Sequence, residues 1–224
     1  RGVPQGDVKA KGKTSVRGTQ IKWKRDLEIF SGVTEYDRER VADRLRELAF
    51  LNPGLTIQLD DERANKLYSA TYAYAGGIKD YLNEVVGKKK TQIPVLFFTD
   101  QKSVSIAFCW TDNTTEDVRC YANNTFNSDG GTHATGFKGA LTRIVQNYAK
   151  EHGLTKDLPA DGISGADVRE GLVAIVNVRM SNPSFSSQTK DKLVTPEAKT
   201  LVEDLFTDQV DHYFAQNPQV AKKI

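Results

Sequence analysis

The chain has 224 residues, of which 38% are hydrophobic and 27% are charged, as in a soluble globular protein of one large domain or one and a half. Its formal net charge of +2 is too small to indicate nucleic-acid binding by itself, so any DNA contact must come from a local patch. No apolar run approaches membrane-spanning length and no signal peptide is visible, so we expect a cytoplasmic protein without a membrane partner.

The N-terminal stretch is polar and broken by glycine. Residues 6–14 have nearly the spacing of a phosphate-binding loop, but five residues separate Gly6 from Gly12 instead of four, and no hydrophobic strand precedes them. We therefore reject that motif. Residues 18–24 alternate in polarity and predict a half-buried strand, and residues 26–30 predict a short strand or a turn.

The next segment predicts a helix and then a strand pair. Thr34 is the expected N-cap, with Asp37 three residues on, and apolar residues at helical spacing predict a helix over 35–51. Strands are expected over 55–59 and 68–74, and the second returns beside the first. Further on, the pattern predicts a helix over 78–86 and strands over 94–99, 104–110 and 118–123.

Gly130 and Gly131 provide backbone freedom for a sharp turn into a helix over 133–151, on which Lys138 faces outward. A helical turn over 166–170 leads into a strand over 172–179. After the loop that holds Gln188 and Lys190, Pro196 marks the start of a closing helix, expected over 198–214.

Motifs that carry chemistry are almost absent. There is no Gly-x-Ser-x-Gly elbow, no His-Glu-x-x-His pair and no evident paired-carboxylate or metal site. His133 is expected to play a structural role, capping the turn or packing under it. Cys109 and Cys120 are expected on neighbouring strands; a bridge is conceivable, but reduced buried thiols are favoured in a cytosolic protein.

One basic loop is the exception. Gln188 carries an amide donor and Lys190 a compact cation on a flexible stem, so a mobile loop could bring both to a phosphate held by another domain. The plain alternative is that Lys190, like most lysines, is simply solvated.

Three motifs and their order resemble a known family. Asp129 to Lys138 reads Asp-Gly-Gly-Thr-His-Ala-Thr-Gly-Phe-Lys, residues 167–172 read Asp-Val-Arg-Glu-Gly-Leu, and residues 187–193 read Ser-Gln-Thr-Lys-Asp-Lys-Leu. Residues 45–51, 52–54 and 76–79 extend the match over nearly the whole chain. Together they resemble the transducer domain of bacterial type IIA DNA topoisomerase B subunits, and the chain is more similar to gyrase B than to its topoisomerase IV counterpart.

The resemblance implies a fold and a domain division. Residues 1–30 would be the C-terminal strands of a GHKL-type ATPase domain, and residues 31–224 the transducer domain. The transducer would be an α/β (α+β sandwich) domain similar to ribosomal protein S5 domain 2, with a four-stranded sheet, helices on one face and a left-handed β-α-β crossover.

The resemblance also implies site residues. Gln188 and Lys190 would contact the γ-phosphate of ATP, where a lysine stabilises developing charge and senses whether the phosphate is present. Thr19 would contact the adenine through water, although the sequence alone favours an ordinary strand threonine. Lys138 would meet DNA. ATP and Mg²⁺ would be held by the complete subunit and not by this fragment, which contributes no metal ligand.

As a whole, the resembled enzyme couples ATP binding and hydrolysis to DNA strand passage and negative supercoiling. The partners implied are a gyrase A subunit in an A2B2 heterotetramer, a second B subunit on ATP binding, and double-stranded DNA. The fragment alone is expected to be inactive.

Two alternatives remain open at this stage. A topoisomerase IV B subunit would share every residue discussed. A non-enzymatic nucleic-acid-binding module of the same fold would instead use residues 88–90, which are three consecutive lysines, together with the basic N-terminal arm.

Overall fold

The computed structural model describes residues 3–32, 35–63, 67–155 and 162–224. The chain divides into two compact units, residues 1–41 and residues 42–224, which are described separately. The helices and strands are α1 (Arg38–Leu51), β1 (Ile57–Asp61), β2 (Tyr68–Tyr72), α2 (Ile78–Val86), β3 (Leu96–Thr99), β4 (Val104–Trp110), β5 (Asp117–Ala122), β6 (Thr125–Phe126), α3 (Thr132–Glu151), α4 (Gly165–Arg169), β7 (Leu172–Val178), α5 (Glu197–Gln216) and α6 (Pro218–Ala221).

The strand expected over residues 18–24 is wrong, because no strand forms between residues 3 and 32. A strand needs a hydrogen-bonded neighbour, and alternation of polarity alone does not supply one. Residues 26–30 form a turn, in which the Phe30 N–H donates to the Asp26 carbonyl at 3.0 Å.

Helix α1 begins three residues later than predicted. The Asp37 carboxylate accepts the N–H of Arg40 at 3.1 Å, which is the geometry of an N-cap. The expected cap, Thr34, lies outside the described residues. Helix α1 ends at Leu51, directly before Asn52-Pro53-Gly54, as predicted.

A mixed sheet forms the centre of the larger unit. Its strand order is β3-β4-β7-β5-β6, and every neighbouring pair is antiparallel except β5 and β7, which are parallel. The expected number of strands was four. The additional strand, β6, is only two residues long, and Asn123 and Asn124, both with positive φ, turn the chain into it.

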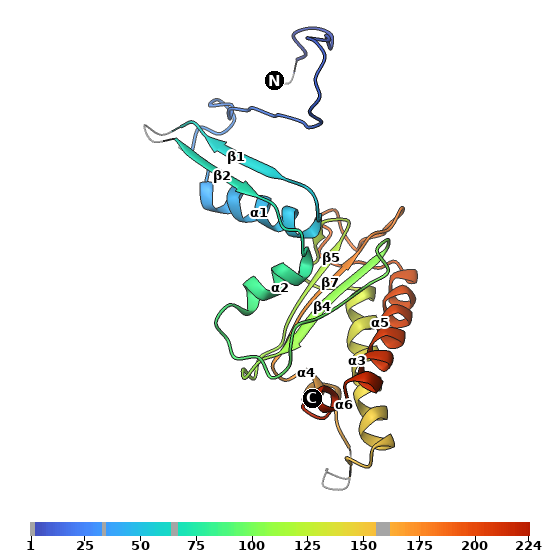
Figure 1. Ribbon diagram of the computed structural model, residues 1–224. Helices are drawn as coiled ribbons and strands as arrows, with labels where there is room; N and C mark the ends of the chain where they lie inside the picture. The colour runs from blue at the N-terminus through green and yellow to red at the C-terminus, as the bar shows by residue number, and fades with distance from the viewer. Residues whose placement is uncertain (1–2, 33–34, 64–66, 156–161) are drawn as a thin grey trace. The chain divides into compact units, whose positions relative to one another are not determined.

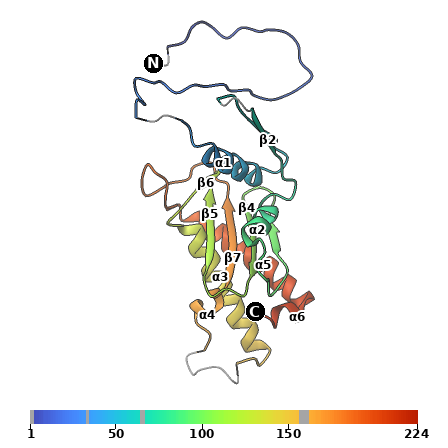
Figure 2. The same cartoon turned by 90° about the vertical axis from the view of Figure 1, so that its left-hand side faces the viewer.

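The connection between the parallel strands has an unusual hand. In Figure 2 the strands β5 and β7 point upward with β5 to the left, and α3 lies behind them. Seen from the helix side, the path from β5 through α3 to β7 therefore moves to the left, which is a left-handed crossover.

Helices cover both faces of the sheet, not one as predicted. Figure 1 shows α3 and α5 on one side and α2 on the other. All seven residues of β7 are buried, six of them apolar, and a strand of this kind needs cover on both faces.

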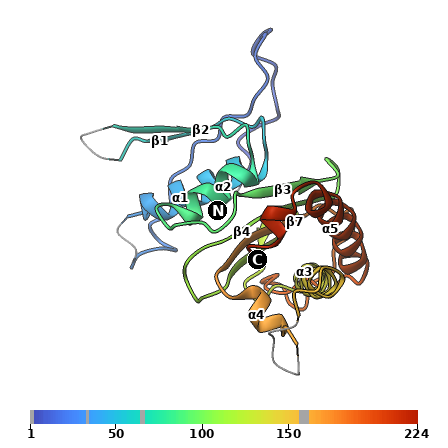
Figure 3. The same ribbon diagram turned by 60° about the horizontal axis from the view of Figure 1, so that its bottom comes forward.

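Aromatic side chains fill the two layers beside the sheet. On the α3 and α5 face, the rings of Phe108, Phe137 and Phe206 meet with centroids 5.0–6.1 Å apart. On the opposite face, Phe50 of α1 stacks on Tyr81 of α2 at 4.9 Å. Figure 3 shows α3 and α5 side by side on the far side of the sheet from α2.

The two cysteines do not lie on neighbouring strands, which corrects the prediction. Strand β7 separates β4, with Cys109, from β5, with Cys120. In the register, Cys109 pairs with Val173 and Cys120 with Val176, so their side chains point to opposite faces of the sheet. Both are free buried thiols, and the geometry excludes a bridge between them.

The remaining elements complete the unit. Strands β1 and β2 pair antiparallel as a separate two-stranded sheet, as predicted from residues 55–59 and 68–74. The short α6 was not predicted; it begins at Pro218, a residue well suited to a first helical turn. None of the helices in the described ranges is long and apolar enough to cross a bilayer.

Candidate functional site

The loop of Gln188 and Lys190 has a closed base. After β7, residues 184–186 run antiparallel to residues 192–194, with a bridge between Phe185 and Leu193. The Ser186 N–H donates to the Lys192 carbonyl at 3.0 Å, and the Val194 N–H donates to the Ser184 carbonyl at 2.9 Å. The base therefore behaves as a short strand pair, and only residues 187–191 project from it.

The projecting tip is a tight turn. The Lys190 N–H donates to the Ser187 carbonyl at 3.2 Å, and Lys190 has φ of 61°, a left-handed conformation that non-glycine residues seldom adopt. The hydroxyl of Thr189 donates to the Asp191 carboxylate and lies 2.7 Å from the hydroxyl of Ser187. These short-range contacts hold the turn in one shape.

The tip is fastened to the turn that opens α3. The Asp129 N–H donates to the Asp191 carbonyl at 2.9 Å. One step along, Gly131 and Leu193 form a parallel bridge, with the Leu193 N–H on the Gly130 carbonyl at 3.0 Å. A Cβ on Gly131 would lie 2.2 Å from the Leu193 carbonyl oxygen, so only glycine permits this approach.

The side chains of the two predicted site residues lie at the surface. Gln188 and Lys190 are both exposed. Within the described part of the chain, the Gln188 amide has no hydrogen bond and Lys190 has no ion pair; the Lys190 ammonium lies 5.5 Å from the centroid of the Phe185 ring. The loop thus presents a cation and an amide on a rigid base, in an arrangement suited to an external anion.

Lys138 lies on α3 and is already paired. Its ammonium contacts Glu116 Oε1 at 2.6 Å, and Arg169 of α4 contacts the other carboxylate oxygen at 3.1 Å. The Lys138 side chain remains 38% exposed. A shallow groove of about 450 Å³ runs beside these residues, lined by Thr135, Lys138, Gly139, Thr142, Arg143, Gln146 and Arg169. The lining contains three cations and no carboxylate, although Lys138 and Arg169 pair with the adjacent Glu116 and Arg143 interacts with Asp211, so the surface keeps a moderate preference for anions.

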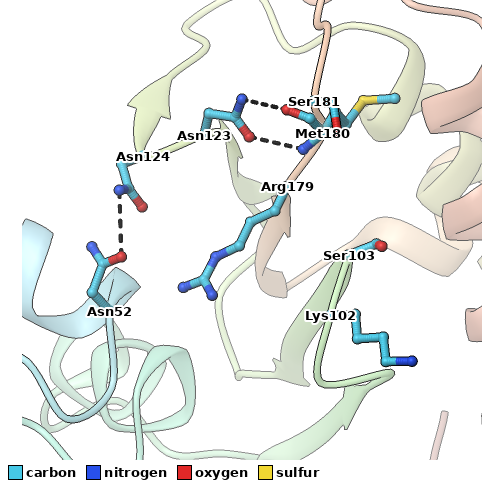
Figure 4. A pocket seen from close by; sticks show the side chains of 8 residues that line it. All are labelled: Asn52, Lys102, Ser103, Asn123, Asn124, Arg179, Met180 and Ser181. Atoms are coloured by element: carbon cyan, nitrogen blue, oxygen red, sulfur yellow. Dashed lines mark hydrogen bonds between the residues drawn. The ribbon is translucent and has the colours of Figure 1, made fainter.

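A second hollow, of about 570 Å³, lies where the β5–β6 turn meets the end of β7. Figure 4 shows the side chain of Asn123 bonded to the Met180 backbone in both directions, at 2.7 and 2.9 Å. Arg179 donates to the last carbonyl of α1, on Leu51, at 2.7 Å. Neither Gln188 nor Lys190 lines this hollow, which is built from contacts that join α1 to the sheet.

Thr19 belongs to the unit of residues 1–41, where it is exposed and not part of a strand. Gln188 and Lys190 thus lie on the same turn, Lys138 lies on α3, and Thr19 belongs to the N-terminal unit of residues 1–41. Residues 88–90 are exposed in the connection after α2, as expected for solvated lysines. The described residues contain no cluster of three metal-ligating side chains.

His133 is a core residue. It is fully buried in the first turn of α3, and burial lowers its pKa to about 4, so the ring is neutral. Neither ring nitrogen has a hydrogen-bond partner among the described residues. The predicted structural role holds, but as packing and not as a cap.

Four residues around these sites were missed by the sequence reasoning. Glu116 and Phe185 contact Lys138 and Lys190, and Asn127 and Asp129 contact the loop backbone. Only Asp129 had a local signal, the Asp-Gly-Gly turn. Glu116 and Asn127 are distant in sequence from the residues that they contact, and Phe185, although close to Lys190 in sequence, carries no polar group that would single it out.

The fold is that of the ATPase region of type II topoisomerases. The chain is similar to the crystal structure of the 43K ATPase domain of Thermus thermophilus gyrase B, with a TM-score of 0.74 and 31% identity over 89% of this chain and 54% of that one. The topoisomerase IV ATP-binding domain of Francisella tularensis has the same fold, with a TM-score of 0.70, 24% identity, and coverage of 84% of this chain and 51% of that one.

Sequence relatives identify the family. Residues 77–224 match the DNA gyrase B family. The whole chain aligns with the gyrase B proteins of Bacillus mycoides, at 38% identity, and of Halalkalibacterium halodurans, at 39% identity, covering 56% and 36% of those proteins. This chain belongs to the DNA gyrase B family. It spans about half, or less, of the length of these relatives.

Proposed function

We propose that residues 31–224 are the transducer domain of a DNA gyrase B subunit and that residues 1–30 belong to the ATPase domain that precedes it. In the complete subunit, which would hold ATP and Mg²⁺, the transducer couples ATP binding and hydrolysis to strand passage and negative supercoiling. Its partners would be gyrase A in an A2B2 assembly, a second B subunit and double-stranded DNA, in the cytoplasm.

The observation that carries this proposal is the anchored loop. Lys190 has no carboxylate partner among the described residues, and its exposed side chain and that of Gln188 project from the same turn, on a base held by backbone hydrogen bonds. A cation held in this way can stabilise the charge that develops on the γ-phosphate at little cost in reorganisation. The adenine contact of Thr19 is part of the same proposal.

The loop also offers a physical route for coupling. A γ-phosphate bound by Lys190 and Gln188 would tie the nucleotide to the first turn of α3, since that turn holds the loop backbone. Loss of the phosphate after hydrolysis would remove the tie and free the two domains to reorient.

Lys190→Ala in the complete subunit tests the assignment. We expect the kcat of ATP turnover to fall at least about a hundredfold, as when one charge-stabilising donor is removed from an active site. Lys192→Ala is the matched control, because Lys192 is an exposed lysine two residues further on the same loop. Equal turnover of the two variants would contradict the proposal.

The isolated chain gives a second test. It should neither bind nor hydrolyse ATP with Mg²⁺, because the glutamate that activates water in the resembled family, and the metal site, would belong to a part of the ATPase domain outside these 224 residues. Clear turnover by the 224-residue chain would mean that it contains a complete nucleotide site and would refute the assignment of roles.

DNA contact at Lys138 is the third part of the proposal. The groove beside Lys138 has an excess of cations, but Glu116 neutralises part of it. Glu116→Gln should therefore raise the affinity of the complete subunit for duplex DNA several-fold and steepen its salt dependence. Lys138→Gln should weaken binding on all sequences alike. An unchanged affinity in both variants would remove this surface from the DNA path.

Topoisomerase IV remains the nearest alternative, since its ATP-binding domain shares the fold. The complete enzyme distinguishes them: negative supercoiling of relaxed plasmid supports gyrase, and relaxation or decatenation without negative supercoiling supports topoisomerase IV.

A further inference from the structure

Asn127 lies directly under the Lys190 loop. It follows β6 and is only 2% exposed. Its backbone is fixed at both ends: the N–H donates to the Cys120 carbonyl at 2.8 Å, and the carbonyl accepts from the Gly130 N–H at 2.9 Å. With its backbone held by the sheet and by the turn before α3, the side chain has little freedom to point elsewhere.

The Asn127 amide donates to the carbonyl oxygen of Lys190 at 2.6 Å. The next carbonyl, that of Asp191, accepts from the Asp129 N–H at 2.9 Å. Two consecutive peptide groups of the tip are thus held from below by the same segment. A buried donor that loses such a partner is costly, so this hydrogen bond stabilises the observed arrangement of the tip.

Lys190 needs support of this kind. Its φ of 61° is a strained conformation for a residue with a side chain, and such conformations persist only when their surroundings hold them. If the peptide group relaxed to a negative φ, the side chain would leave the loop in a different direction. The direction in which the Lys190 side chain leaves the backbone is therefore set by the peptide group that Asn127 holds.

We propose that Asn127 is a positioning residue for Lys190: it does not touch the phosphate, but its amide fixes the peptide group from which the phosphate-contacting side chain projects. This inference rests on the proposed role of Lys190. In the absence of phosphate, the Lys190 ammonium makes a cation–π contact with the Phe185 ring, whose centroid is 5.5 Å away.

Two substitutions separate the hydrogen bond from packing. Asn127→Ala removes the amide, and Asn127→Asp keeps its shape but replaces the donor with an oxygen that faces the Lys190 carbonyl. Asn147→Ala is the control, because Asn147 lies on the exposed side of α3. Hydrogen exchange of the Lys190 N–H in the 224-residue chain should accelerate in both Asn127 variants and not in the control.

The deciding experiment is a double-mutant cycle for ATP turnover in the complete subunit. We expect Asn127→Ala to lower kcat by about tenfold, as for the loss of one hydrogen bond that orients a reacting group. In the Lys190→Ala background the same substitution should have no further effect, because nothing remains for it to position. Unfolding midpoints are measured alongside, and Asn127→Asp takes the place of the alanine variant if the latter does not fold.

Each result bears on a different claim. If Lys190→Ala leaves turnover intact, the proposed function fails, whatever Asn127 does. If Lys190→Ala impairs turnover but the Asn127 variants do not, the positioning inference alone is overturned. An equal loss in both backgrounds would show that Asn127 acts only through stability, and would overturn it as well.

Discussion

Gly131→Ala probes the contact that fastens the loop to α3. The added Cβ would lie 2.2 Å from the carbonyl oxygen and 2.6 Å from the nitrogen of Leu193, both backbone atoms that cannot turn aside. Gly131 also has φ of 138°, which residues with a side chain rarely adopt. Backbone strain of about 1–3 kcal/mol and two weakened hydrogen bonds of about 1 kcal/mol each give an expected loss of roughly 3–5 kcal/mol in the free energy of unfolding.

Thermal and urea unfolding of the 224-residue chain, followed by circular dichroism, measures this loss. At about 2–4 °C per kcal/mol for a chain of this size, the midpoint should fall by roughly 10 °C. Gly139→Ala is the control, since its Cβ would meet only the Glu203 carboxylate at 3.8 Å in the middle of α3. Alanine there should raise stability by about 0.5–1 kcal/mol. A Gly131→Ala protein as stable as the wild type would refute the close approach.

Three further outcomes follow from buried groups. Burial lowers the pKa of His133 to about 4, so the free energy of unfolding should fall by up to about 3 kcal/mol as the pH drops from the ordinary histidine value through 4. In urea titrations at a series of pH values, His133→Gln should flatten this dependence and the exposed His152→Gln should not. Burial raises the pKa of Cys109 to about 11 and of Cys120 to about 12. Both thiols should therefore resist a disulfide reagent at about pH 8 until the chain unfolds. The free energy of unfolding should decline only as the pH rises above about 9 towards these pKa values. Tyr121→Phe removes the 2.5 Å hydrogen bond from the phenol to a carboxylate of α1 and should cost about 1–3 kcal/mol in urea unfolding; an unchanged midpoint would show that the bond adds nothing.

Local patterns in the sequence predicted most of the elements of the larger unit. Helix α2 and strand β4 have the predicted bounds, and α3 differs by one residue, because apolar spacing and flanking glycines are local signals. The strand over residues 18–24 failed because its pairing partner is not a local property. The order of the strands in the sheet could not be predicted from the sequence either. Alternation of polarity shows which face of the sheet a residue occupies, but not that β7 lies between β4 and β5.

The site was predictable only in part for the same reason. Gln188 and Lys190 were found through a motif, and the structure places them together at one tip. The residues that hold this tip, Asn127 and Asp129, lie about sixty positions earlier in the chain, as the contact between Asn127 and Lys190 spans 63 residues. No spacing rule reaches that far, so the support of the loop could be seen only in three dimensions.

The close fit of α3 against α5 gives the loop a mechanical consequence. A Cβ on Gly136 would lie 2.6 Å from the carbonyl oxygen of Lys199, so the two helices touch backbone to backbone and cannot slide freely. The loop is fastened to the first turn of α3 and runs directly into α5, and each helix has 20 residues and is thus about 30 Å long. A pull on the tip would therefore act on both helices at once, and the pair would transmit it along its length as one stiff body.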